Sequence, residues 1–144
     1  MSISGWKSKL SKFSQLGGAD KWLLFRATAW LLIARIMLAA MPFDRLSARL
    51  ATESDLIATE CDPKILARVG YAVRVAASQV PWRSDCFPQA IAAQKLLKRY
   101  GQATKIHFGV ERVGDNGLEG HAWLTSGDTI VIGDTDLTRY TEIT

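Results

Sequence analysis

The sequence contains few of the residues that build metal centres and covalent cross-links. Its 144 residues include only two cysteines and two histidines. The cysteines, Cys61 and Cys86, are too few for a disulfide framework, and no residues have the paired spacing of metal ligands. We therefore expect no metal and no other cofactor. The sequence also has no internal repeat and no low-complexity segment.

Long uninterrupted hydrophobic runs are missing as well. Residues 1–20 are polar and basic, and no small-residue cleavage site follows them, so we expect no secretory signal. Residues 22–43 are very apolar, but Arg26 and Arg35 interrupt them, and an arginine at the centre of a bilayer is costly. We expect a largely buried helix here rather than a membrane-spanning one. Peripheral contact with a membrane remains an alternative.

Positive charge is concentrated in the first third of the chain. Residues 1–50 hold eight Lys or Arg and two Asp, a net +6, whereas residues 51–144 hold ten Lys or Arg and twelve acidic residues, a net −2. We do not expect nucleic acid as a partner, because the basic residues are scattered and no DNA-reading motif accompanies them. The basic part suits an acidic peptide, an acidic partner or anionic lipid. It is equally well explained as a solvated helix face.

Composition and local signals predict one compact α+β domain. Hydrophobic residues make up 48% of the chain and charged residues 22%, which is typical of a globular protein. Residues 1–80 form the expected helical region, and residues 81–144 the expected helix that begins at Cys86 with its antiparallel strands. The expected helices cover residues 21–40, 43–50, 63–80 and 86–100, and the expected strands residues 105–112, 118–125 and 129–132. Asp20 is the expected cap of the first helix, and Asp62 with Pro63 starts the third.

Cys86 opens the expected helix 86–100 in the segment PWRSDCFPQA. A helix N-terminus carries unpaired N–H groups and partial positive charge, which favour the nucleophilic thiolate. His121 lies on the expected strand 118–125, and Asp134 follows the next strand. We expect Cys86 to be a nucleophile, His121 its proton carrier and Asp134 the group that orients the imidazole. A nucleophilic thiol has to stay reduced, which indicates the cytoplasm.

Other residues compete for these roles. Asp136 is a second candidate for the orienting carboxylate, but Asp134 is preferred because it directly follows the strand expected beside the histidine. Cys61 is expected to be a small buried side chain and His107 a structural histidine. A metal held by the three candidate residues is not favoured, because they lack paired ligand spacing.

The order thiol, imidazole, carboxylate is also that of papain-like and transglutaminase-like enzymes, and three segments resemble one family. RSDCFPQA with the following LLKRYG, then IHFGV, then GHAW resemble the lasso-peptide leader peptidases, which are transglutaminase-like microcin-processing proteins. The resemblance covers about residues 20–140. It implies a papain-like fold and a triad in which Cys86, His121 and Asp134 match the nucleophile, the base and the third member. Arg83 matches an arginine of the family just before the cysteine.

The resemblance also implies a substrate and partners. In that family the protease removes the leader from a ribosomally made precursor, and the core peptide passes to a separate ATP-dependent cyclase. Some members carry an additional leader-recognition domain. This chain resembles the split form, which acts with a separate small leader-binding protein. Two alternatives remain: acyl transfer on the same residues, as in transglutaminases or arylamine acetyltransferases, and a non-catalytic scaffold that binds leader or partners.

Overall fold

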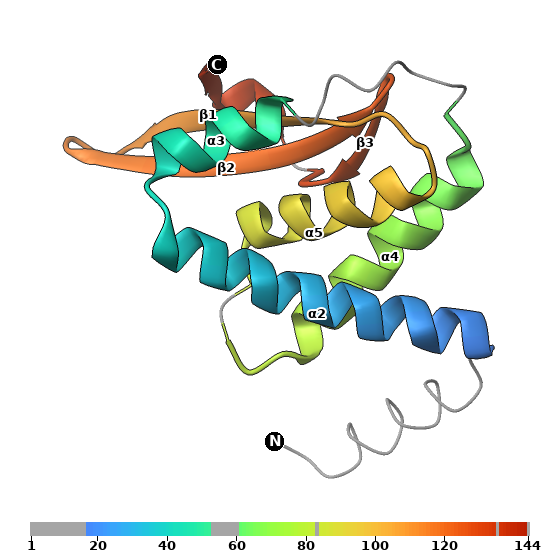
Figure 1. Ribbon diagram of the computed structural model, residues 1–144. Helices are drawn as coiled ribbons and strands as arrows, with labels where there is room; N and C mark the ends of the chain where they lie inside the picture. Colours follow the sequence, from blue (N-terminus) through green and yellow to red (C-terminus); the bar gives the residue numbers. More distant parts are fainter. Residues whose placement is uncertain (1–16, 53–60, 83, 135, 144) are drawn as a thin grey trace, which may run out of the picture.

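The computed structural model describes residues 17–52, 61–82, 84–134 and 136–143. Within these residues, helices come first and an antiparallel sheet follows, so the predicted α+β class is confirmed (Figure 1). The helices are α2 (Gly18–Ala40), α3 (Phe43–Thr52), α4 (Pro63–Gln79) and α5 (Cys86–Arg99). The strands are β1 (Lys105–Val113), β2 (Gly117–Ser126), β3 (Thr129–Ile132) and β4 (Thr141–Ile143), with the 3₁₀ helix η1 (Leu137–Arg139) before β4.

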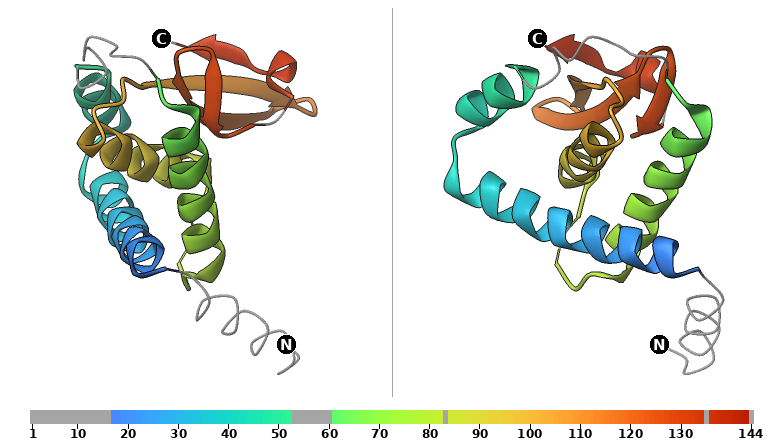
Figure 2. Two further views of the ribbon diagram at one scale, coloured as in Figure 1. Left: turned by 90° about the vertical axis from the view of Figure 1, so that its right-hand side faces the viewer. Right: turned by 45° about the vertical axis from the view of Figure 1, so that its right-hand side comes forward.

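Helix α5 lies at the centre of the fold. It contacts β1, β2 and β3 on one side and α2 on the other, and α4 packs against both α5 and β3 (Figures 1 and 2). A helix covered on several sides has to be apolar around most of its circumference. The buried residues of α5 are Pro88, Ala90, Ile91, Ala92, Ala93, Gln94, Leu96 and Leu97. The start of α5, and with it Cys86, is therefore held in a fixed position relative to the sheet.

Helices α4 and α5 start and end where the sequence predicts. Asp62 caps α4, since its Oδ1 accepts the backbone N–H of Lys64 over 2.9 Å, and Pro63 occupies the first turn. Gly101 follows the end of α5 with a φ of 69°, a left-handed conformation that glycine adopts without strain.

Helix α2 does not start as the sequence predicts. It begins at Gly18 instead of Lys21, and Gly17 is its N-cap residue. The predicted cap, Asp20, instead forms an ion pair with Arg68 of α4, with an Oδ1–Nη2 distance of 2.6 Å. The carboxylate of Asp20 contacts a neighbouring helix, and a local sequence pattern does not reveal such a contact.

The predicted burial of α2 is wrong. Only its inner face lies in the core, because α4 and α5 cover one side of the helix and no described element covers the other. The buried residues are Leu23, Ala27, Leu31 and Ala34. Large apolar side chains on the outer face are exposed. Burial in the core therefore does not explain why this side of the helix is apolar.

The sheet has the strand order β3-β2-β1-β4, with all neighbours antiparallel. The β1–β2 pairing places Gly109 opposite His121. The β2–β3 pairing reaches only as far as Leu124 opposite Ile132, so β2 has an open edge at Ala122, near the start of α5. Strand β4 and η1 were not predicted, because β4 is a short, exposed strand without alternating burial.

Candidate active site

Cys86 is the first residue of α5, and its thiol points to the open edge of β2. Its Sγ accepts the backbone N–H of Ala122, the residue after His121, over 3.4 Å. The chain before it is held by Gln89, whose Nε2 donates to the Ser84 carbonyl over 2.7 Å and whose N–H donates to the Asp85 carbonyl over 3.3 Å. The local hydrogen bonds of the helix start therefore fix where the sulfur lies.

Cys86 and His121 line the same pocket, which has a volume of about 240 Å³. The thiol comes from the start of α5 and the imidazole from the middle of β2. Apart from these two residues, the lining is apolar or glycine; the residues are Phe43, Phe87, Phe108, Gly109, Val110, Gly120, Ala122 and Ile143. The structure thus brings together the two residues that the sequence assigns to nucleophile and base.

Three phenylalanines from separate elements form one wall of this pocket. The ring centroids of Phe87 on α5 and Phe108 on β1 are 4.9 Å apart, and Phe43 on α3 lies 5.8 Å and 5.2 Å from them. All three pairs meet edge to face, which is a favourable geometry for aromatic rings. Helix α3 thereby contributes directly to the site.

The imidazole of His121 is oriented by a backbone carbonyl. Its Nε2 lies 3.0 Å from the Gly133 oxygen. A carbonyl oxygen can only accept, so Nε2 carries the hydrogen and donates, and Nδ1 of the neutral ring holds the free lone pair. The ring also stacks on Tyr140 at 4.9 Å and faces Trp123 at 6.0 Å. These contacts leave Nδ1 as the basic nitrogen.

Two glycines make this arrangement possible. Gly133 has a φ of 83°, and a Cβ there would lie 2.7 Å from the Ala122 oxygen. A Cβ at Gly109, opposite His121, would lie 2.9 Å from the Tyr140 Cβ and 3.0 Å from Trp123 Cζ3. Any side chain at either position would push the carbonyl or the aromatic rings away from the imidazole.

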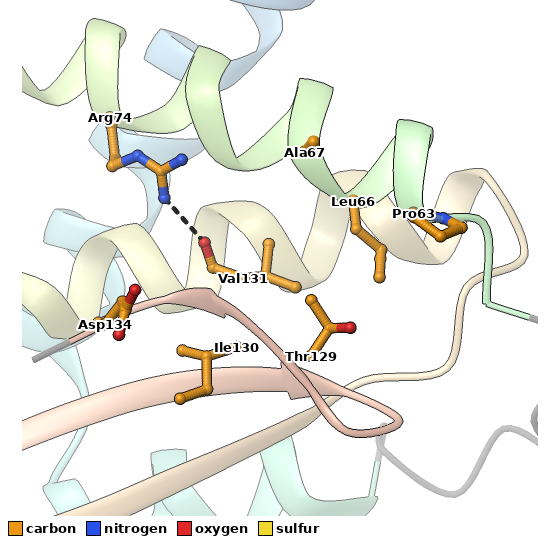
Figure 3. A pocket seen from close by; sticks show the side chains of 9 residues that line it. Pro63, Leu66, Ala67, Arg74, Thr129, Ile130, Val131 and Asp134 are labelled. Atoms are coloured by element: carbon orange, nitrogen blue, oxygen red, sulfur yellow. Dashed lines mark hydrogen bonds between the residues drawn. The ribbon is translucent and has the colours of Figure 1, made fainter.

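Asp134, the predicted third member, lies outside this pocket. Its side chain is exposed and lines a second cavity of about 560 Å³ between α4 and β3 (Figure 3). In that cavity Arg74 Nη1 donates to the Val131 carbonyl over 2.9 Å. Within the described residues no hydrogen bond joins Asp134 to His121, and the role of its carboxylate stays a prediction.

Asp136, the competing carboxylate, caps η1. Its Oδ1 accepts the backbone N–H of Thr138 over 3.2 Å and also the hydroxyl of the same residue. The hydrogen bonds from Thr138 hold the pKa of Asp136 below its usual range. This carboxylate is occupied in shaping the C-terminal segment. Arg83, which the family resemblance singled out, lies outside the described residues.

The remaining cysteine and histidine lie in structural contacts. Cys61 is half-buried, and its Sγ lies 3.2 Å from Ser126 Oγ. His107 lies between Glu142 of β4, at 2.6 Å from Nδ1, and Thr125 of β2, at 2.9 Å from Nε2. Both histidine contacts join neighbouring strands. No three His, Cys, Asp or Glu side chains converge within the described residues.

Several contributors to the site were not predicted from the sequence, among them Phe43, the Gly133 carbonyl and the Tyr140 ring. Gly133 stands between a short strand and an aspartate, where a glycine indicates a turn but no contact. Tyr140 follows η1, which carries no sequence signal. Only the pairing of distant elements brings these groups to Cys86 and His121.

A thiol at the start of a central helix, facing a histidine on an antiparallel strand, is the arrangement of the papain-like cysteine proteases and acyltransferases. The chain belongs to the transglutaminase-like superfamily, whose family model matches residues 23–144. This match covers the described helices from Leu23 onward and the whole sheet. No curated protein and no solved structure matches the chain.

Proposed function

We propose that this chain is a cysteine endopeptidase that removes the leader from a lasso-peptide precursor. The observation that carries the proposal is the shared pocket of Cys86 and His121, with the imidazole held so that Nδ1 is the basic nitrogen. Membership of the transglutaminase-like superfamily supports a cysteine protease or acyltransferase. The segments around Cys86, His107 and His121 supply the resemblance to leader peptidases.

In the first step, His121 Nδ1 takes the thiol proton and Sγ of Cys86 attacks the carbonyl carbon of the scissile peptide bond. Negative charge develops on the carbonyl oxygen. The backbone N–H of Cys86, at the positive end of α5, donates to that oxygen. The step requires Sγ to exchange its contact with the Ala122 N–H for the substrate. Catalytic hydrogen bonds are often incomplete before substrate binds.

In the second step the C–N bond breaks, and the proton on Nδ1 passes to the leaving amine. The acyl group stays on Cys86 as a thioester. Water then attacks the thioester, His121 takes its proton, and the carboxylate product leaves with the thiol restored. Because Nε2–H donates to Gly133 throughout, the ring gains and loses its proton at one nitrogen only.

Partners complete the proposal. A separate small leader-binding protein would hold the precursor near Cys86 and raise the local concentration of the scissile bond. The freed core would pass to an ATP-dependent cyclase. We place the reaction in a reducing cytoplasm, because a nucleophilic thiol has to stay reduced.

The test is precursor cleavage followed by mass spectrometry. The wild-type chain with a leader-binding protein should release leader and core, the chain alone should do so poorly, and Cys86→Ala should be inactive. Cys61→Ala is the matched control and should stay active. Normal turnover by Cys86→Ala would refute a cysteine mechanism.

The same reaction distinguishes two other functions. An added primary amine that ends up on the leader's new C-terminus, in place of water, would identify an acyltransferase. Binding of the precursor without any covalent change, by wild type and Cys86→Ala alike, would identify a non-catalytic scaffold. Either result would replace the peptidase proposal.

A further inference from the structure

Helix α2 presents an apolar face to the outside of the molecule. The exposed fractions are 61% for Trp22, 63% for Phe25 and 57% for Ile36, although all three are large apolar side chains. At helical spacing the apolar residues of this face fall on one side. They are Trp22, Phe25, Ala29, Leu32, Ile33 and Ile36, which we call the outer face of α2. A patch of this kind on a soluble domain marks an interaction surface.

Helix α2 can keep its place in the core and still present its outer face to a partner. By length and composition α2 could cross a membrane. However, Ala27, Leu31 and Ala34 on its inner face are 0% exposed and belong to the same core as α4 and α5. Insertion across a bilayer would strip that core of its cover. A helix with one face in a protein core and one apolar face outside can lie in the plane of an interface.

The positive charge of the first third of the chain suits an anionic surface. Residues 1–50 carry a net +6, from eight Lys or Arg and two Asp. Exposed Arg35 lies on α2, and Asp20, the only acidic residue of this helix, is paired with Arg68. Lys7, Lys9 and Lys12 precede α2 in the sequence, and residues 1–16 contain no acidic residue.

We propose that the outer face of α2 docks the protein on an anionic lipid surface. Protein interfaces combine apolar contacts with polar groups that pair across them. The outer face offers only apolar side chains with cations at its margins, which is what lipid chains and anionic headgroups require. Trp22 lies near the N-terminal end of the face, and indole rings favour the headgroup region.

Docking through α2 leaves the active-site pocket in solution. Helix α2 lies on the side of α5 that faces away from the sheet (Figures 1 and 2). The pocket is formed instead by α3, the start of α5 and strands β1, β2 and β4. A membrane-docked chain could therefore still receive a peptide.

The experiment is co-sedimentation of the full chain with vesicles of phosphatidylcholine, with and without phosphatidylglycerol, at low and high salt. We expect binding to the phosphatidylglycerol vesicles that falls as salt rises. The test variant is Phe25→Glu with Ile36→Glu, which should weaken binding by about tenfold or more. The matched control is Val113→Glu with Leu118→Glu in the β1–β2 hairpin, where both residues are also exposed.

The two double variants are equal in charge, because each replaces two neutral residues by two acidic ones and lowers the net charge from +4 to +2. A selective loss in the α2 variant supports the proposal, and Phe25→Ser with Ile36→Ser repeats the test if the Glu variant fails to fold. No vesicle binding by the wild type, or equal losses in both variants, would overturn it. Two results without lipid would also overturn the proposal. One is a dimer, seen by light scattering, that the α2 variant does not form. The other is a loss of activation by the leader-binding protein in the α2 variant.

Discussion

The imidazole Nε2 of His121 lies 3.0 Å from the carbonyl oxygen of Gly133, and this contact selects the tautomer of the ring. Gly133 follows β3, whose pairing with β2 has ended at Leu124. The carbonyl can reach the ring because Gly133 adopts a φ of 83° and packs against the backbone of Ala122 and Trp123. The backbone of one strand end therefore contacts the imidazole nitrogen that a carboxylate contacts in a conventional triad.

A side chain at position 133 should damage catalysis beyond its effect on stability. Gly133→Ala and Gly101→Ala both place alanine at a positive φ, which costs about 1–2 kcal/mol. Only at Gly133 does the new Cβ collide with the backbone, whereas at Gly101 nothing lies within 4 Å. We expect both variants to be destabilised in thermal unfolding, and kcat of precursor cleavage to fall only in Gly133→Ala. Equal kcat values for the two folded variants would contradict the role of this carbonyl.

Asp134→Asn should have a smaller effect than loss of the proton carrier. The Gly133 carbonyl already accepts the Nε2 hydrogen, so we expect kcat/KM to fall by less than about tenfold, against about 10²–10⁴-fold for His121→Ala. Asp136→Asn should change cleavage little, because the amide Oδ1 can still accept from Thr138 and cap η1. Steady-state cleavage rates of the three variants provide the comparison. An Asp134→Asn loss as large as that of His121→Ala would make the carboxylate the orienting group.

Phe43→Ala should affect substrate binding more than chemistry. Phe43 is 47% exposed and forms part of the pocket wall together with Phe87 and Phe108. A residue that binds ground state and transition state alike raises KM without changing kcat when it is removed. We expect KM to rise by about three- to tenfold. Phe25→Ala on α2, assayed without vesicles, is the control; an equal change there would mean that Phe43 has no specific role.

The fold could be predicted from the sequence wherever local signals decide the structure. Asp62 with Pro63 and the glycine after α5 are such signals, and both helices agree with them. The burial of α2 could not be predicted, because an apolar helix has the same composition whether protein or another partner covers its outer face. Strand β4 escaped prediction because its three exposed residues are held by pairing with β1, which no local pattern encodes.

The site could be predicted only in part. Cys86 carried a signal because it opens a helix, and His121 because it lies on a strand that follows, in the order thiol, imidazole, carboxylate. The Gly133 carbonyl carried none, since backbone groups of all residues look alike in a sequence. Asp134 was preferred because it directly follows the strand expected beside His121. It adjoins Gly133 in the sequence, yet its side chain lines a different cavity from that of Cys86 and His121.

The claim that Cys86 and His121 form one catalytic unit can be tested without knowing the substrate. The measurement is the rate of iodoacetamide alkylation at each cysteine at neutral pH, followed by peptide mass spectrometry. We expect Cys86 to react at least about tenfold faster than Cys61, because its sulfur lies at a helix N-terminus beside an imidazole. His121→Ala should remove most of this difference and leave the rate at Cys61 unchanged. Equal rates at the two cysteines in the wild type, or a Cys86 rate that does not respond to His121→Ala, would contradict the account.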